Sequence, residues 1–455
     1  MSGTRIPWVL IAAILGSAMG FIDGTAVNVS LPVLQRELHA TTAQTQWVIE
    51  GYSLFLSALI LVGGSLGDLY GRRLIFGLGI ALFALASAGC ALASTPEMLI
   101  GARCIQGIGG ALLTPGSLAM LSAAYSGEAR GRAIGLWSGF SALTAALGPV
   151  IGGWLTQAFS WRYVFVINLP IALLVLIIVA WHVKESRDES SARRIDVTGS
   201  ALATIGLALL VYGLIAMNGR NISASAVACV VVGLAALVLF VVFERRTNDP
   251  MLRPDLFTIR AFSVSNAYTF FLYAALGGSL YFVPFVLINV HHYSPAAAGG
   301  ALLPFIAITV AASRWSGGLV VRIGARTPLL FGGILAGIGF LAYALPGSDG
   351  SYWTTFFPAA IVLGCGGALF VAPLTTTVMN SVPVEHAGIA SGINNAVART
   401  AGLIGIAALG LAVTGTASYL GGFRIAMTIS ALLCFIAAAI AAIGLNPLRA
   451  DHLRS

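Results

Sequence analysis

Long apolar runs separated by short polar breaks follow one another along the whole chain. A membrane-spanning helix needs about 20 consecutive apolar residues, and reading each run as one span gives about 14 spans. The predicted spans cover 8–32, 46–66, 74–94, 97–121, 132–157, 163–182, 197–217, 224–243, 262–288, 297–319, 328–346, 353–378, 388–414 and 424–445. The pattern therefore predicts an all-α membrane protein.

One polar break has a degenerate copy in the second half of the chain. The break reads GSLGDLYGRR over Gly64–Arg73, and the copy reads GGLVVRIGAR over Gly317–Arg326. Repeated halves are how secondary transporters build alternating access around a central site. The copies follow the second and tenth spans, so two spans are additional to two halves of six. We expect a six-helix bundle over 1–183, an inserted helix pair with flanking cytoplasmic loops over 184–261, and a second six-helix bundle with a short cytoplasmic tail over 262–455.

Composition narrows the class of protein. Hydrophobic residues make up 58% of the chain and charged residues 9%, whereas a soluble domain carries about 25% charged residues. Lipid must therefore be the main solvent, and no stretch is long enough for a soluble catalytic domain, so we do not expect an enzyme. The phosphate-binding pattern GxxxxGK[ST] is absent, which argues against ATP as the driver. The five cysteines lie in apolar runs without CxxC spacing, and we expect no metal site and no bound cofactor.

The net charge of +8 orients the chain in the membrane and does not indicate nucleic acid as a partner. With the N-terminus inside, most basic residues face the cytoplasm, and the exceptions are Arg36, Arg162, Arg220 and Arg424. This asymmetry is the positive-inside rule. It predicts that both termini are cytoplasmic and that the basic loops contact anionic lipid.

Charged residues inside the spans are the candidates for chemistry, because a charge near the bilayer centre is costly. Asp23 lies about 22 Å above the inner end of the first span, and Arg103 lies about 21 Å up the fourth. A nearby Arg favours the charged form of a carboxyl group, whereas burial favours the neutral form. We therefore expect Asp23 to be the principal proton-coupling residue, modulated by Arg103. The alternative is a static ion pair that fixes the two spans.

Glu50 is a second acidic residue in the outer third of the first half, about 6 Å below the outer end of its span. Three roles stay open for it from the sequence. These roles are a second proton site, a group that attracts a cationic substrate, and a solvated residue at the mouth of the span.

Several motifs together resemble one family. They are Gly64–Arg73, DGTAVNVSLP over Asp23–Pro32, RCIQG over Arg103–Gly107, LGPVIGGW over Leu147–Trp154, WRYVFVINLP over Trp161–Pro170, and ASGINN over Ala390–Asn395 with Arg399. In this order they are similar to the drug:proton antiporters with 14 spans, within the major facilitator superfamily. The resemblance covers the whole chain. It implies the major facilitator fold, a monomer in the cell membrane, and export of small lipophilic, cationic compounds driven by the proton gradient.

The resemblance also suggests which residues move, whereas the substrate candidates rest on their residue types and places in the spans, and the role of Glu50 does not follow from the resemblance. Asp68 is expected to meet the N-terminal end of a neighbouring span and a cytoplasmic Arg, which would stabilise the outward-facing state; the alternative is a purely topogenic loop. Gly148-Pro149 with Gly152 is expected to allow close packing and a bend that matters for antiport, against an ordinary kink. The gating candidates are Gly64, Asp68, Gly71, Arg72, Arg73, Gly148, Pro149 and Gly152. The substrate candidates are Glu50, Tyr52, Phe140, Asn168, Tyr273, Asn394 and Asn395.

Other functions fit the same pattern of spans. An exporter of a lipid, a siderophore or one natural product would differ only in the residues that line its cavity. A proton-coupled importer would reverse the direction, although the motif in the fifth span argues against it. A membrane sensor without transport is a different class, but the chain carries no cytoplasmic output domain.

Overall fold

The computed structural model describes residues 7–187, 196–217, 223–247, 253–345, 351–382, 387–416 and 418–445. Helices fill most of these ranges, and no strand occurs within them. By length and composition, 14 helices can cross a membrane, and they follow the predicted spans closely. The predicted number and order of spans are confirmed. Arg220 and both chain ends fall outside the described residues, so their predicted side of the membrane stays a prediction.

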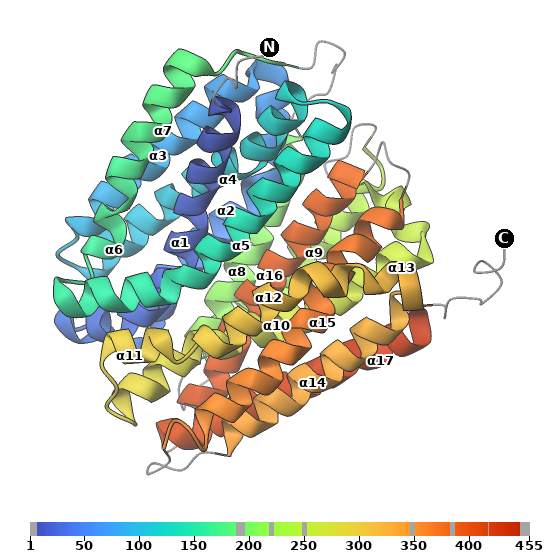
Figure 1. Ribbon diagram of the computed structural model, residues 1–455. Helices are drawn as coiled ribbons and strands as arrows, with labels where there is room; N and C mark the ends of the chain where they lie inside the picture. The colour runs from blue at the N-terminus through green and yellow to red at the C-terminus, as the bar shows by residue number, and fades with distance from the viewer. Residues whose placement is uncertain are drawn as a thin grey trace. The chain divides into compact units, whose positions relative to one another are not determined.

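The helices follow one another in a single series (Figure 1). The first half contains α1 (Trp8–Glu37), α2 (Thr42–Tyr70), α3 (Arg72–Ala91), α4 (Pro96–Ala124), α5 (Gly127–Ala158), α6 (Tyr163–Val166) and α7 (Asn168–His182). Then come α8 (Val197–Ala216) and α9 (Ala224–Glu244). The second half contains the short 3-10 helix η1 (Pro254–Thr258), α10 (Arg260–Asn289), α11 (Pro295–Gly300), α12 (Leu303–Gly317), α13 (Leu319–Ile323), α14 (Arg326–Ala344), α15 (Phe356–Asn380), α16 (Ala387–Thr414) and α17 (Tyr419–Gly444).

Two predicted spans are interrupted helices. The span over 163–182 divides at Ile167 into α6 and α7, and Pro170 then occupies the first turn of α7, where its missing N–H costs least. The span over 297–319 is divided between α11 and α12, and α13 begins at its last residue. Pro304 stands at the start of α12, and Gly318 separates α12 from α13. Both residues favour helix ends over helix interiors.

The chain divides into two compact units. One comprises residues 1–210, 231–251 and 294–299, and the other comprises 211–230, 252–293 and 300–455. In the first unit α4 packs against α2 and α3, α1 against α5, and α3 against α7. In the second unit α15 packs against α12 and α14, α10 against α16, and α14 against α17. The two units therefore use the same helix pairings, as the sequence repeat predicts. The boundary passes through α8 and α9, and the three-part division of the chain stays a prediction.

A reciprocal glycine contact recurs in both units. In the first unit Gly79 of α3 and Gly109 of α4 face each other, and a Cβ on either residue would lie 3.0 Å from the carbonyl oxygen of the other. Gly332 of α14 and Gly366 of α15 make the same contact in the second unit, at 3.2 and 3.0 Å. Small residues let helix backbones approach closely within a membrane. The repeat thus extends from the polar hairpins into the interior of the helix packing.

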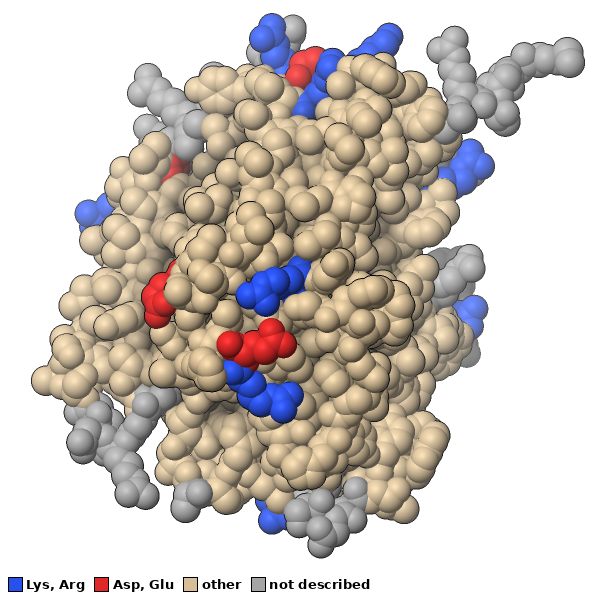
Figure 2. Space-filling view, turned by 90° about the vertical axis from the view of Figure 1, so that its left-hand side faces the viewer, with Lys and Arg blue, Asp and Glu red and all other residues tan. Residues whose placement is uncertain are grey.

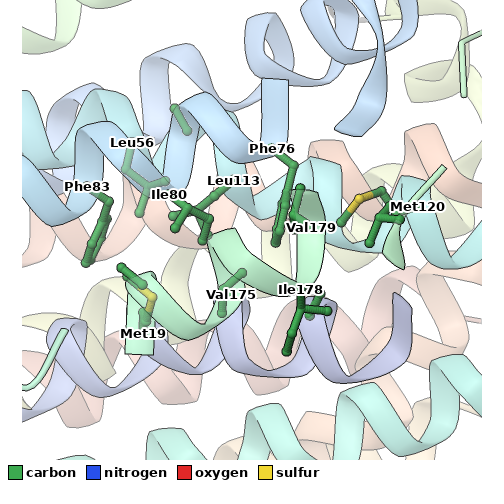
Figure 3. Packing of buried hydrophobic residues seen from close by; sticks show 14 of the residues in the cluster. Met19, Leu56, Phe76, Ile80, Phe83, Leu113, Met120, Val175, Ile178 and Val179 are labelled. Carbon is green, nitrogen blue, oxygen red and sulfur yellow. The ribbon is translucent and has the colours of Figure 1, made fainter. Parts of the chain in front are cut away.

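The core of the first unit lies between α1, α2, α3, α4 and α7. Its buried side chains include Met19, Phe76, Phe83, Met120 and Val175, and they interdigitate between the helices (Figure 3). Phe76 and Phe83 lie seven residues apart on one face of α3 and are fully buried. This packing fixes the relative positions of the helices that carry the buried charges described below.

Helix ends in the first unit alternate between two sides. At one side Trp8 stacks on His182 with ring centroids 4.4 Å apart, so the start of α1 meets the end of α7. At the other side the indole N–H of Trp161 donates to Glu37 at 2.8 Å, so the end of α1 meets the start of α6. This alternation agrees with consecutive crossings of a membrane.

The outer surface is mostly apolar. On the face shown in Figure 2 uncharged residues predominate, and acidic and basic side chains occupy only small areas. Large hydrophobic side chains are exposed on many helices, and only 17% of the apolar window of α9 is buried. Such a surface is suited to lipid and would be unstable in water.

Candidate functional site

Asp23 and Arg103 form a fully buried ion pair between α1 and α4. Arg103 Nη1 donates to Asp23 Oδ2 at 2.5 Å, and neither side chain is exposed. The guanidinium Nε donates to the carbonyl oxygen of Val48 on α2 at 2.9 Å. The sequence placed the two charges at nearly the same depth, and their contact is confirmed.

Three uncharged polar side chains complete this network. Gln106 accepts from Arg103 Nη1 at 2.7 Å and donates to Asp23 Oδ1 at 2.9 Å. It also donates to Ser87 Oγ at 2.8 Å. Asn168 Nδ2 lies 3.3 Å from both Asp23 Oδ1 and Ser87 Oγ. A buried ion pair is tolerated only where further hydrogen bonds satisfy its remaining lone pairs and protons, and these amides supply them. The five residues therefore form one connected group, which we call the Asp23 network.

Aromatic rings cover the guanidinium. Arg103 Cζ lies 4.3 Å from the ring centroid of Tyr52 and 5.7 Å from that of Phe165. A desolvated cation over an aromatic face gains roughly 2 kcal/mol. Tyr52 and Asn168, which were predicted to contact substrate, thus support the ion pair in this conformation. Arg103 Nη2 has no hydrogen-bond partner among the residues that the structure describes.

Glu50 lies apart from the Asp23 network. It is fully buried on α2, and neither of its carboxyl oxygens has a hydrogen-bond partner among the described residues. The carbonyl oxygen of Val48 and the ring of Tyr52 contact Arg103. Residue 50 is rotated by about 200° from residue 52 around the helix axis, so Glu50 starts from the opposite face of α2. The structure therefore separates two acidic residues that the sequence placed together.

The remaining substrate candidates lie on other elements. Asn394 of α16 donates to Thr269 Oγ1 at 2.7 Å and to Asn266 Oδ1 at 3.2 Å, which makes a polar cluster in the second unit. Asn395 is exposed and donates to the carbonyl oxygen of its neighbour one turn back at 3.1 Å. Tyr273 is half-buried, and Phe140 of α5 is exposed. Their contact with substrate stays a prediction.

The polar hairpin turns sharply between α2 and α3. Arg72 donates to Asp68 Oδ1 through Nε at 3.0 Å and through Nη2 at 2.8 Å. The predicted arginine partner of Asp68 is thus a residue of the same hairpin, and a contact with the end of a neighbouring span stays a prediction. Gly71 has φ +119°, a conformation that favours glycine. Gly64 faces Pro115 of α4, and a Cβ there would lie at an ordinary 3.6 Å.

Helix α5 uses glycine on two sides. Gly148 and Gly152 face Thr25 and Ala26 of α1, and a Cβ on Gly152 would lie 2.7 Å from Ala26 Cα. On another side a Cβ on Gly153 would overlap the carbonyl oxygen of Pro295 at the start of α11. The predicted close packing is confirmed. It places α5 against α1 within one turn of Asp23.

A second contact joins α11 to α5. A Cβ on Gly299 would overlap the carbonyl oxygen of Pro149, and the backbone N–H of Ala296 donates to Gln157 Oε1 at 3.3 Å. Helix α5 continues through Pro149 from Gly127 to Ala158. The gating role of these residues stays a prediction.

Sequence reasoning missed Ser87 and Gln106 as members of the network. Gln106 had a signal, since it follows Arg103 by three residues and therefore shares its helix face. Ser87 had none, because a single serine in an apolar helix commonly bonds its own backbone, as Ser87 also does to Phe83 at 2.8 Å. Among the described residues no group of three or more His, Cys, Asp or Glu side chains could hold a metal ion.

Comparison with known proteins agrees with this architecture. The structure resembles a bacterial homologue of the human lysosomal transporter Spinster with a TM-score of 0.70, at 16% sequence identity and with 97% of each chain covered. It also resembles a peptide transporter at a TM-score of 0.69 and 14% identity, covering 98% of this chain and 97% of that one. At these identities the likeness concerns the fold alone.

Sequence relatives are nearer. The multidrug resistance protein Stp of Mycobacterium tuberculosis is 38% identical over 88% of this chain and 74% of its own length. The puromycin resistance protein of Streptomyces alboniger is 34% identical, covering 91% of this chain and 83% of the relative. The tetracenomycin C resistance and export protein of Streptomyces glaucescens is 31% identical, covering 89% and 76%. Residues 13–406 match the family profile described as Major Facilitator Superfamily. The chain is a multi-pass membrane protein that belongs to this superfamily.

Proposed function

We propose that the protein exports small lipophilic, cationic compounds across the cell membrane in exchange for protons. The names of the relatives support export, since they describe multidrug resistance, puromycin resistance, and tetracenomycin C resistance and export. The repeated units support alternating access. We further propose that both termini are cytoplasmic, that the protein acts as a monomer without a cofactor, and that the proton gradient supplies the energy.

The observation that carries proton coupling is the contrast between two buried acidic residues. Asp23 accepts hydrogen bonds from Arg103, Gln106 and Asn168, so its carboxylate is compensated as an anion. Glu50 accepts none within the described chain and is fully buried. An isolated carboxylate in an apolar site is far more costly than the neutral acid. Glu50 therefore fits the form that carries a proton.

This contrast suggests a division of roles. Glu50 holds the proton in the present conformation and releases it when water or a cationic substrate reaches the carboxyl group. The Asp23 network then links protonation to helix packing, because Arg103 donates both to Asp23 on α1 and to the backbone of α2 at Val48. If Arg103 moves away from Asp23, that carboxyl group loses its charge partner and can take up a proton, which is the coupling role that the sequence predicts for Asp23.

The test is ethidium efflux from proteoliposomes under an imposed proton gradient. We expect gradient-driven efflux by the wild type, and its loss in Glu50→Gln, which keeps the shape and the neutral form but cannot release a proton. Downhill ethidium exchange should persist in that variant. Glu97→Gln is the matched control, because Glu97 is exposed and accepts a hydrogen bond from Gln44 at 2.6 Å. Retained gradient-driven efflux in Glu50→Gln would refute the assignment of the proton to Glu50.

A second candidate function is export of one natural product. Two of the relatives carry the name of a single antibiotic. Absence of ethidium movement, combined with gradient-driven efflux of an antibiotic such as puromycin, would favour this narrower exporter over a multidrug one.

A further inference from the structure

The segment that follows α7 is bonded to the turn between α2 and α3. Glu185 Oε1 accepts from the backbone N–H of Arg73 at 3.0 Å, and Oε2 accepts from that of Leu74 at 3.1 Å. The carbonyl oxygen of Ser186 accepts from the backbone N–H of Arg72 at 2.9 Å. The first three N–H groups of α3, which have no partner within their own helix, are thus all satisfied by this one segment. We call residues 183–187 the strap.

Three further contacts stabilise the strap and its junction with α7. Arg73 Nη2 donates back to the carbonyl oxygen of Ala180 near the end of α7 at 2.8 Å. Val183 is buried in the hydrophobic core of the first unit. Glu185 also accepts from the N–H of Ser186 at 2.9 Å, which fixes the orientation of its carboxylate. The strap therefore has one apolar anchor in the core and one charged anchor at α3.

The contact with Glu185 gives a specific reason why position 71 is glycine. Its φ of +119° suits glycine, and a Cβ there would lie 2.6 Å from Glu185 Cδ and 2.7 Å from Oε1. The carboxylate occupies the space that a side chain at 71 would need. Gly71 thus serves two purposes at once, the turn of the hairpin and the seat of Glu185.

We propose that Glu185 is a positioning residue for transport, which holds the hairpin between α2 and α3, the start of α3 and the strap together as one unit when the protein changes conformation. Its charge suits this role, since a carboxylate at a helix N-terminus is favoured by the helix dipole. The pair Asp68–Arg72 lies directly beside the anchored amides, so the strap also fixes the position of Arg72 relative to Asp68. The role in transport rests on the proposed function, whereas the contact with α3 does not.

The first test is amide hydrogen exchange on the full chain in detergent. In Glu185→Ala the amides of Arg73 and Leu74 lose their acceptors, and we expect their exchange to be about fivefold faster. The amide of Ile75 should be unchanged, because it donates to Gly71 within the helix at 3.0 Å. Glu185→Gln retains one acceptor oxygen and should give an intermediate result. Unchanged exchange at Arg73 and Leu74 would refute the contact itself.

The second test separates a positioning role from simple capping. Glu185→Ala should lower the maximal transport rate about fivefold, the population change that loss of one such cap allows. KM should stay within about twofold, because no strap residue is among the substrate candidates. Glu185→Gln should restore part of the rate, and Glu97→Gln should behave as the wild type. Faster exchange without a lower rate would overturn the positioning role.

A double-mutant cycle tests whether Gly71 and Glu185 act through the same contact. Gly71→Ala displaces the carboxylate and also strains the turn, so it should slow transport by itself. Combined with Glu185→Ala it should slow transport less than the product of the two single effects, since one shared contact is removed twice. Fully multiplicative effects would overturn the proposal. A wild type without gradient-driven transport would refute the proposed function, while the exchange result would still decide whether the strap holds α3.

Discussion

Breaking the Asp23–Arg103 pair should cost far more stability than breaking an equivalent pair at the surface. In Asp23→Asn the guanidinium of Arg103 stays buried without a counter-charge, and it already has one nitrogen, Nη2, without a partner. Removing one member of a buried pair typically costs 3–5 kcal/mol, so we expect a loss of about 4 kcal/mol. At about 2 °C per kcal/mol for large domains, the melting temperature should fall by roughly 8 °C.

The structure also predicts an asymmetry within the pair. In Arg103→Gln the carboxylate of Asp23 still accepts from Gln106 at 2.9 Å and from Asn168 at 3.3 Å. The loss of folding stability in Arg103→Gln should therefore be smaller, about 3 kcal/mol. The double variant removes both charges and should be more stable than Asp23→Asn alone, because no unpaired charge stays in the interior.

The assay is thermal unfolding in detergent, followed with a maleimide dye that becomes fluorescent on reaction with a thiol. Cys90 and Cys434 are fully buried and report the loss of packing in the first and second unit respectively. Asp68→Asn is the matched control, because its pair with Arg72 is half-exposed and worth at most about 1 kcal/mol. A fall of less than about 2 °C in Asp23→Asn, or equal falls in Asp23→Asn and Asp68→Asn, would refute the reasoning.

Two further predictions concern packing. Gly152→Ala places a methyl group 2.7 Å from Ala26 Cα, and this overpacking should lower the free energy of unfolding by about 1–3 kcal/mol. Gly139→Ala on the same helix is the control, because its methyl group meets no atom within 4 Å and should be neutral or stabilising. Similar melting temperatures for the two variants would contradict the tight contact between α1 and α5. In the folded protein Cys90 and Cys434 should resist labelling by a small maleimide because both are buried, and mass spectrometry that finds them labelled before unfolding would contradict their burial.

The spans and the buried pair could be predicted from the sequence for a simple reason. The apolar runs are long, and counting residues along a helix converts position into depth, which placed Asp23 and Arg103 at one level. Depth does not give rotation about the helix axis. Glu50 was therefore grouped with Arg103, although it starts from the face of α2 opposite Tyr52.

Contacts that depend on loops could not be predicted in this way. Glu185 is 112 residues from Arg73, and no periodicity relates the end of α7 to the start of α3. The Gly/Arg composition of the hairpin indicated a turn, but it did not indicate that the seat beside Gly71 is filled by a distant carboxylate.

Helix α5 limits how this protein can diverge. A methyl group at position 152, 153 or 299 would overlap a backbone carbonyl oxygen of the facing segment, and one at position 148 would overlap the hydroxyl of Thr25. Larger side chains at these sites clash with the facing segment whatever the substrate is. An exposed position on the same helix, such as Phe140, can accept many different side chains. A saturation library should therefore show the smallest number of tolerated residues at these glycines and a larger number at exposed positions of α5, and new substrate ranges should arise by change at the exposed positions.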